Sequence, residues 1–403
     1  MSRRAVVRPK LVTLILLSGL SIVSLNMFLP SLPNIALEFN ADYAIVNLSI
    51  AGYAFMTAIL QIVMGPLSDR FGRRPVILSG LVLFCLASLG CALARNIESF
   101  LVFRMIQASI ISGYAVSLAI IRDSSEDQKA ASLIGYVATV WAFAPMLGPM
   151  LGGVLDEFFG WRASFWAFLA AGAAVLGLCS LDLRETNLSP SKTLREQIQT
   201  YPELFRSRRF WGYTLCMTFS TGAFYVYLSG VPLVASILFD LSIAGIGLYM
   251  GGITAGFILG SFLAGRYSTR FALTTMMLAG RIVACTGLLA GLLILAIGLV
   301  HPATLFGLCV FVGIGNGITM PSCNSGVMSV RPRLAGSASG LCGALTVAGG
   351  AVLSAITGVV ISGEGAGYVL LGMMLLTSAL GLVATLFVMR VDRSESFRSA
   401  AAD

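Results

Sequence analysis

The sequence predicts an all-α membrane protein in which twelve membrane-spanning helices form two pseudo-symmetric halves of six helices each. Three observations support this fold class: a strongly apolar composition, apolar runs at regular intervals, and basic residues concentrated in alternate breaks between the runs. Of the 403 residues, 57% are hydrophobic and only 11% are charged, and the mean hydropathy is +0.90. Soluble domains carry about 25% charged residues, so a soluble fold is excluded.

Twelve apolar runs are each long enough to cross a bilayer, which takes about 20 residues of helix. The first run follows four basic residues and resembles a signal peptide, but it extends further than a signal core and shows no small-residue cleavage site. We therefore predict a retained first span. The predicted spans cover residues 11–36, 43–64, 76–94, 100–121, 131–155, 164–183, 210–236, 243–264, 275–299, 304–329, 336–361 and 367–389.

The longest polar break divides the chain near its midpoint. We predict an N-terminal half over residues 1–183, a cytoplasmic linker over 184–209 and a C-terminal half over 210–403. A short repeat supports this division, because Gly65-Pro-Leu-Ser-Asp-Arg-Phe71 recurs after the second span of the other half as Gly265-Arg-Tyr-Ser-Thr-Arg-Phe271. Parallel six-helix repeats are one of the plans of secondary transporters, which bind substrate near the bilayer midplane where the repeats meet.

Lysine and arginine lie almost wholly in one set of breaks. Only four of the 26 lie elsewhere: Arg95 and Arg162 in the opposite set of breaks, and Arg104 and Arg281 within or at the start of spans. By the positive-inside rule, the other 22 mark the cytoplasmic side of the membrane.

This asymmetry predicts the topology in the cell inner membrane. Both termini and residues 184–209 are predicted to be cytoplasmic, whereas residues 156–162 and 300–303 are predicted to be periplasmic. Anionic lipid and cytosol account for the net charge of +8, and no nucleic-acid partner is expected.

The cysteines and the single histidine do not form the pattern of a metal site or a disulfide framework. All eight cysteines fall within apolar runs without a CxxC pair, and His301 lies in a predicted periplasmic turn beside Pro302. Because zinc sites need clustered cysteine and histidine ligands, neither a metal nor a cofactor is expected.

Residues 65–75 are predicted to form a charged cytoplasmic turn. Gly65 and Gly72 are expected to permit close packing and a tight turn. Asp69 is expected to accept hydrogen bonds from a neighbouring helix N-terminus, where negative charge is favoured. A merely basic turn is the alternative. Three basic residues are expected to hold the turn in the cytosol: Arg70, Arg73 and Arg74.

Three segments resemble motifs of the major facilitator superfamily. Residues 65–75 resemble its signature loop between helices two and three, Arg104-Met-Ile-Gln-Ala108 its RxxQG element, and residues 144–153 its proline-glycine exporter motif. The resemblance implies the superfamily's fold and transport by alternating access. The residues it marks for coupling or gating are Asp69, Arg70, Arg73, Arg104, Pro145, Gly148 and Pro149.

Further segments are similar to the bicyclomycin/chloramphenicol-resistance (Bcr/CflA) branch of drug:proton antiporters. They are Leu29-Pro-Ser-Leu-Pro33, Arg122-Asp123, Gly160-Trp-Arg-Ala-Ser-Phe-Trp166 and Ala335-Gly-Ser-Ala-Ser-Gly340. This resemblance, which covers nearly the whole chain, implies export of small amphipathic drugs by proton antiport. Phenicol-like or similarly compact antibiotics are the substrates that it implies.

One position departs from that branch, which has an aspartate three residues before its first Leu-Pro. Here the residue is Asn26, which cannot titrate, and all 18 acidic residues lie in breaks or near span ends. The branch's proton carrier is therefore missing. Asp123, at the inner end of span four, is the candidate for coupling, with capping or pairing in a cytoplasmic turn as the alternative role.

Polar side chains within the spans are the candidate substrate ligands. A charge inside the bilayer costs about 2.5–3.5 kcal/mol, so Arg104 is expected to line the pathway or take part in coupling, with snorkelling or structural pairing as the alternative. Gln107 lies on the same helical face. For the other candidates, interhelical bonding or ordinary packing is the alternative. They are Asn26, Tyr53, Gln61, Tyr114, Trp141, Tyr225, Tyr227, Asn316 and Asn324.

The expected function is that of a secondary exporter, and the alternative is a proton-coupled transporter of a small metabolite on the same fold. An enzyme or a primary pump is not expected, because the sequence has no GxxxxGK[ST], HExxH or GxSxG motif. The expected partners are a small drug-like molecule, protons and the lipid bilayer, and the chain is expected to function as a monomer.

Overall fold

Long apolar helices make up almost all of the described chain. The computed structural model describes residues 9–124, 127–186, 201–268, 270–331, 334–363 and 365–400. Eleven helical segments within these ranges are long and apolar enough to cross a membrane. Helix α7 (Asp127–Phe159) is a further helix of 33 residues and contains predicted span five. The predicted all-α architecture with twelve spans is confirmed.

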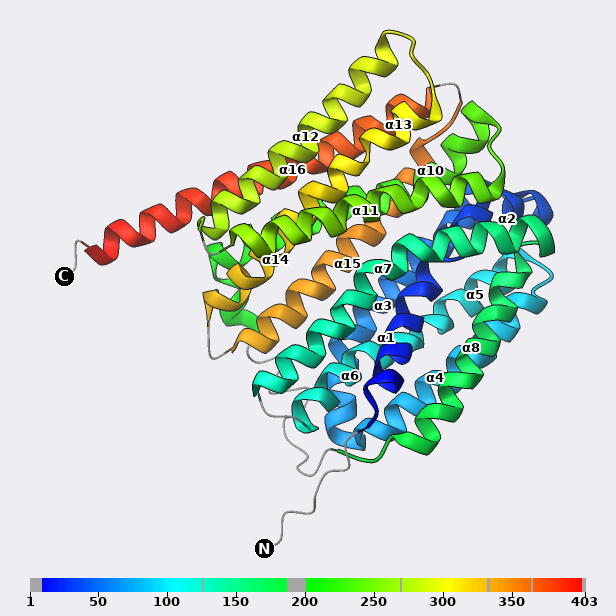
Figure 1. Ribbon diagram of the computed structural model, residues 1–403, viewed down its shortest axis with the longest axis horizontal. Coiled ribbons are helices and arrows are strands. Elements are labelled where there is room, and N and C mark those ends of the chain that lie inside the picture. Colours follow the sequence, from blue (N-terminus) through cyan, green and yellow to red (C-terminus); the bar gives the residue numbers. More distant parts are fainter. Residues whose placement is uncertain are drawn as a thin grey trace, which may run out of the picture. The chain divides into compact units, whose positions relative to one another are not determined.

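The chain divides into two compact units, unit 1 (Met1–Gln197) and unit 2 (Ile198–Asp403). Figure 1 draws unit 1 from blue to green and unit 2 from green to red. Unit 1 contains α1 (Leu11–Asn26), η1 (Leu29–Ser31), α2 (Leu32–Phe39), α3 (Tyr43–Phe71), α4 (Arg73–Leu93), α5 (Ile97–Gln107), η2 (Ala108–Ile110), α6 (Ile111–Ser124), α7 and α8 (Arg162–Asp182). Unit 2 contains α10 (Arg208–Phe239), α11 (Ile243–Tyr267), α12 (Leu273–Ala296), α13 (Pro302–Leu308), α14 (Val310–Val330), α15 (Ala335–Val360) and α16 (Ala366–Ala400).

Three of the predicted spans are interrupted helices. In the first span, α1 ends at Asn26 and η1 precedes α2, at a segment where Pro30 and Pro33 lack the N–H that a continuous helix needs. In the fourth span, η2 separates α5 from α6, and in the tenth, α13 ends at Leu308 and α14 begins at Val310. The apolar runs alone predicted a continuous helix for each of these three spans. An apolar run looks the same in the sequence whether or not the helical hydrogen bonding within it is interrupted.

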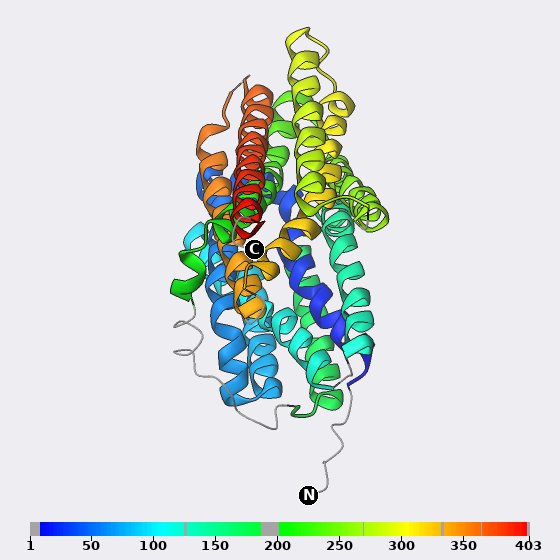
Figure 2. The ribbon, with the colours of Figure 1, turned by 90° about the vertical axis from the view of Figure 1, so that its left-hand side faces the viewer.

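Helices within each unit pack side by side, as the two views in Figures 1 and 2 show. In unit 1, α1 packs against α6, α7 and α8, and α4 packs against α5 and α8. In unit 2, α14 packs against α10, α11 and α12. Glycine permits the closest of these approaches: a Cβ added to Gly260 or Gly317 would meet the backbone of the facing helix. Small residues serve this purpose between membrane helices, which have no hydrophobic effect to hold them together.

The break predicted as a linker over residues 184–209 is helical in part. Residues 201–205 form a helical turn, and α10 begins at Arg208 after Ser207, whose Oγ accepts a hydrogen bond from the Phe210 backbone N–H at 3.3 Å. Residues 187–200 lie outside the described ranges.

Candidate functional site

Arg104 is fully buried in unit 1, near the end of α5 and one turn before η2. Its Nη1 donates to the Ser24 carbonyl oxygen at 3.3 Å and to Gln107 Oε1. Its Nε and Nη2 have no hydrogen-bond partner among the described residues. Because a guanidinium carries five donor hydrogens, Arg104 retains the capacity to bind a further acceptor.

Aromatic rings surround this guanidinium. Its carbon lies 4.2 Å from the ring centroid of Phe28, 4.4 Å from that of Tyr53 and 6.0 Å from that of Phe165. Within the described ranges, no acidic side chain forms an ion pair with Arg104. Cation–π contacts stabilise a desolvated charge by up to about 2 kcal/mol each, but they leave it without a counter-ion. The arrangement can accept an anionic or strongly polar group of a bound molecule.

Uncharged hydrogen bonds connect Arg104 to neighbouring helices. The hydroxyls of Tyr53 and Ser24 are 2.7 Å apart, which joins α3 to α1. Gln107 Nε2 donates to Ser88 Oγ at 2.7 Å, which joins α5 to α4. Three of the predicted site residues, Tyr53, Arg104 and Gln107, thus lie together in one buried cluster of unit 1.

Asn26 lies on a part of the first span that α7 approaches closely. Its Nδ2 donates to the Ile22 carbonyl oxygen at 2.8 Å, while its buried Oδ1 has no partner in the described part of the chain. A Cβ added to Gly148 would lie 3.3 Å from the Asn26 Cβ, and one added to Gly152 would collide with the Met27 carbonyl oxygen. The glycines of the proline-glycine motif therefore permit contact between α7 and the first span. Its prolines, Pro145 and Pro149, lie within the helix.

A second buried arginine lies in unit 2. Arg281, on α12, is fully buried, and its Nη2 and Nε donate to Asn316 Oδ1 at 2.6 Å and Thr319 Oγ1 at 3.1 Å. Asn316 Nδ2 donates in turn to the Ser220 carbonyl oxygen at 3.0 Å. Arg281 Nη1 has no partner among the described groups. Asn316 was a candidate from the sequence and Arg281 was not, although an arginine inside an apolar run was the available signal.

The hydrogen bonds of two further candidates, Tyr227 and Asn324, lie outside both arginine clusters. Tyr227 is buried and donates to the Tyr249 carbonyl oxygen at 2.7 Å, and Tyr225 packs on Gly350. Asn324 is exposed and accepts a hydrogen bond from Ser339 at 3.3 Å. Gln61 and Tyr114 are half-buried. The side chains of Trp141 and Asp123 lie outside the described part of the structure.

The segment predicted as a charged turn is helical as far as Phe71. Gly65 lies within α3, and an added Cβ would meet no atom within 4 Å, so the turn and close-packing role predicted for Gly65 is wrong. Only Gly72, with φ of +97°, separates α3 from α4.

Asp69 forms an ion pair with Arg73 at 2.5 Å, and Arg73 Nη1 also donates to Ser68 Oγ at 2.5 Å. The guanidinium of Arg70 lies 5.2 Å from the Phe71 ring centroid.

Glu185 occupies the N-terminus of α4, in the kind of role that we expected of Asp69 at a neighbouring helix. At the start of α4, its Oε1 accepts a hydrogen bond from the Arg73 backbone N–H at 2.9 Å. Its Oε2 accepts a hydrogen bond from the Arg74 backbone N–H at 3.2 Å. A carboxylate is favoured there by the helix dipole and by the unpaired N–H groups. A Cβ on Gly72 would overlap this carboxylate. Glu185 was not among the predicted residues, because nothing in the local sequence shows that residues after α8 return to the start of α4.

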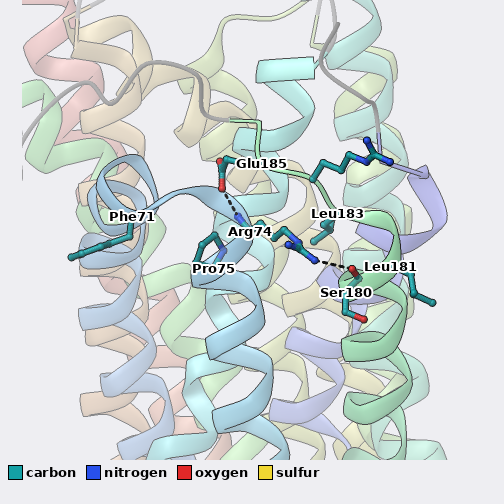
Figure 3. Close-up of a pocket in the computed structure, with 8 residues that line it drawn as sticks. Phe71, Arg74, Pro75, Ser180, Leu181, Leu183 and Glu185 are labelled. Carbon is teal, nitrogen blue, oxygen red and sulfur yellow. Dashed lines mark hydrogen bonds between the residues drawn. The ribbon is translucent and has the colours of Figure 1, made fainter. Parts of the chain in front are cut away.

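A surface pocket lies beside this contact, as Figure 3 shows. Arg74 Nη2 donates to the Ser180 carbonyl oxygen at 2.9 Å across it. The pocket has a volume of about 540 Å³ and is lined by Phe71, Arg74, Pro75, Ser180, Leu181, Leu183, Arg184 and Glu185. Together these contacts tie the α3–α4 junction to the end of α8.

A second charged contact lies at the opposite end of α4. Arg162, at the start of α8, forms an ion pair with Glu38 on α2. It also donates to the Ala92 and Ala94 carbonyl oxygens, at 3.1 and 3.0 Å, at the C-terminal end of α4. A cation is favoured at a helix C-terminus. Trp161 Nε1 donates to the same Glu38 carboxylate at 2.6 Å. Trp161 and Arg162 therefore connect α2, α4 and α8.

We expect Asp69→Asn to slow transport about fivefold at equal protein level. A partly exposed ion pair contributes up to about 1 kcal/mol, and loss of that amount shifts a two-state equilibrium by about fivefold. The measurement is the initial transport rate in reconstituted vesicles. Asp42→Asn, which makes the same change just before the other end of α3, is the matched control. Equal rates for the wild type and Asp69→Asn would remove Asp69 from the mechanism.

These helices and buried polar clusters define a polytopic membrane protein. The chain belongs to the Major Facilitator Superfamily, whose family model matches residues 14–355. It is a transporter, with a small-molecule substrate and a lipid bilayer as its surroundings.

Curated relatives match most of the chain. An uncharacterized MFS-type transporter, YdgK of Bacillus subtilis, is 30% identical over 85% of this chain and 87% of its own length. Multidrug resistance protein MdtL of Escherichia coli O9:H4 is 29% identical over 90% of this chain and 91% of its own length.

Solved structures share the fold. A bacterial homologue of the human lysosomal transporter Spinster, in an inward-facing and unoccupied conformation, superposes with a TM-score of 0.76 at 18% identity, over 95% of this chain and 96% of that one. The peptide transporter POT in complex with sulfate gives a TM-score of 0.75 at 14% identity, over 96% of this chain and 95% of that one. At these identities the likeness concerns the fold.

Proposed function

We propose that this transporter exports small amphipathic drugs across the cell inner membrane by alternating access coupled to proton antiport. The observation that carries the proposal is the similarity to multidrug resistance protein MdtL, which extends over 90% of the chain. The motifs that resemble the Bcr/CflA branch support the same direction of transport, because they occur throughout the chain.

The cluster around Arg104 supports a drug as the substrate. Drug-binding sites are mostly apolar, with a few polar groups that fix orientation. Phe28, Tyr53 and Phe165 supply aromatic surface around one cation, and Asn26 offers a carbonyl oxygen that has no partner among the described groups. A compact molecule with an apolar body and a polar or anionic group matches this chemistry, and phenicol-like antibiotics belong to that class.

The topology of this proposal follows from the 22 basic residues that share one set of breaks. Under the positive-inside rule, this asymmetry predicts that both termini are cytoplasmic. Each chain contains both halves of the repeat, so we propose that the monomer is the transporting unit.

A susceptibility panel in an efflux-deficient host tests this function. Expression should raise resistance to at least one compact amphipathic antibiotic, and a proton uncoupler should abolish the accompanying efflux. Expression of Arg104→Ala at an equal membrane level is the control for the transport site. Unchanged resistance to every compound, together with energy-dependent uptake of a metabolite, would favour the small-metabolite transporter instead.

A further inference from the structure

Asp156 is a buried acidic residue near the C-terminal end of α7, with only 6% of the residue exposed. Both of its oxygens accept hydrogen bonds from Asn34 Nδ2 on α2, at 3.2 and 3.1 Å. The Ser31 hydroxyl lies beside the same carboxylate and has no hydrogen-bond partner that meets normal geometry among the described groups. We had placed residue 156 in a periplasmic loop, whereas it lies inside the helix and inside the protein.

The charged side chains near this end of α7 leave Asp156 without a cation. On the packed elements, Glu38 of α2 and Arg162 of α8 form an ion pair with each other. On α7 itself, Glu157 is exposed. No lysine or arginine in the described ranges pairs with Asp156. An anionic carboxylate that is buried without a cation is electrostatically unfavourable, and binding a proton removes that penalty.

Asp156 continues the face of α7 that contacts the first span. Gly148, Gly152 and Asp156 follow at intervals of four residues, so they lie on one side of the helix. Gly148 faces Asn26, Gly152 faces the Met27 carbonyl, and Asp156 meets Ser31 and Asn34. The first span is interrupted between these points by η1. The carboxylate that Asn26 cannot supply is therefore present on the facing helix, at the same broken segment.

We propose that Asp156 is the group that takes up and releases the coupled proton. This inference rests on the proposed proton antiport. A proton entering from the periplasmic side forms an O–H bond on one carboxylate oxygen and neutralises the side chain. The protonated oxygen donates to Ser31 Oγ, while the other oxygen keeps its hydrogen bond from Asn34. Release to the cytoplasmic side during the transport cycle breaks the O–H bond and restores the carboxylate, so that one proton moves inward.

Two measurements on the full-length transporter in lipid test the proposal. The first is the infrared difference spectrum between acidic and alkaline pH, in which a buried protonated carboxyl gives a distinct C=O band. Asp156→Asn should lose a band that the wild type and Glu157→Gln retain. Asparagine keeps the shape of the side chain and an oxygen for Asn34, so loss of the band reports protonation. Glu157→Gln is the matched control, since it removes the adjacent acid on the same helix.

The second measurement compares chloramphenicol transport driven by an imposed proton gradient with exchange of labelled for unlabelled chloramphenicol without a gradient. Asp156→Asn should reduce gradient-driven transport to the rate without a gradient and leave exchange at the wild-type rate. A purely structural role would reduce both rates together. Partial recovery of gradient-driven transport in Asp156→Glu supports the proposal.

Three results would overturn the proposal: persistence of the carboxyl band in Asp156→Asn, gradient-driven transport equal to the wild type, or equal loss of driven transport and exchange. If the wild type transports neither chloramphenicol nor any other drug of the susceptibility panel, the proposed drug export has failed. The infrared spectra then decide by themselves whether Asp156 binds a proton.

Discussion

Arg104→Ala should reduce drug transport to the level of cells that carry no transporter. The substitution removes the only positive charge of the unit 1 cluster, together with the two hydrogen bonds and the ring contacts that Arg104 makes. Hydrogen bonds to charged groups contribute about 1.5–3 kcal/mol each, so loss of one such contact with a substrate lowers affinity at least about tenfold. The measurements are drug resistance in cells and binding of the same drug to purified protein.

Two further variants separate binding from folding. Arg104→Lys keeps the charge but loses the planar set of donors, and we expect it to retain part of the transport activity. Arg95→Ala removes an exposed arginine shortly before α5 and serves as the matched control. A well-folded Arg104→Ala protein that binds and exports drug as the wild type does would contradict the role assigned to this cluster.

Among the unit 1 glycines whose surroundings the structure describes, Gly152 should be the one at which an added methyl group is most disruptive, as in Gly152→Ala. The added Cβ would overlap the Met27 carbonyl oxygen, which belongs to the backbone and cannot move away as a side chain can. Overpacking in a tight interface costs about 1–3 kcal/mol or more, and here it would force α7 away from the first span. We expect a lower Tm and loss of transport, measured on purified protein and in reconstituted vesicles.

Gly177→Ala is the matched control for this substitution. Gly177 lies within α8, and a Cβ there would meet no atom within 4 Å. Alanine has a higher helix propensity than glycine by about 1 kcal/mol, so this variant should be at least as stable as the wild type. If Gly152→Ala matched Gly177→Ala in both Tm and transport, the close contact between α7 and the first span would be without functional importance.

The sequence was most informative where a physical requirement acts along the chain. A membrane helix must satisfy its backbone hydrogen bonds internally and present apolar side chains to lipid. Each span can therefore be recognised in the sequence as a continuous apolar run, and these runs predicted the all-helical fold. Arg104 was found in the same way, because a charge inside an apolar run is rare and unfavourable. Arg281 carried the same signal and was not used.

Residues 65–75 show where local patterns fail. Glycine and charge predicted a turn over residues 65–75, yet α3 continues to Phe71 and Gly72 alone provides the change of direction. The carboxylate at the start of α4 is Glu185, more than 100 residues away in the chain. The spacing of residues in the sequence does not predict this contact, because the contact forms only when the chain returns to α4 after α8.

By itself, the sequence determined the all-helical membrane fold and the presence of a buried arginine in the fourth span, because burial of backbone and charge in lipid constrains each segment separately. Only the tertiary structure decided which groups accompany that arginine, and that Asp156 is buried against Ser31 and Asn34. A carboxylate three residues from the end of a helix is solvated or desolvated according to what packs on it. That environment is created by the first span, which lies more than 100 residues earlier in the chain.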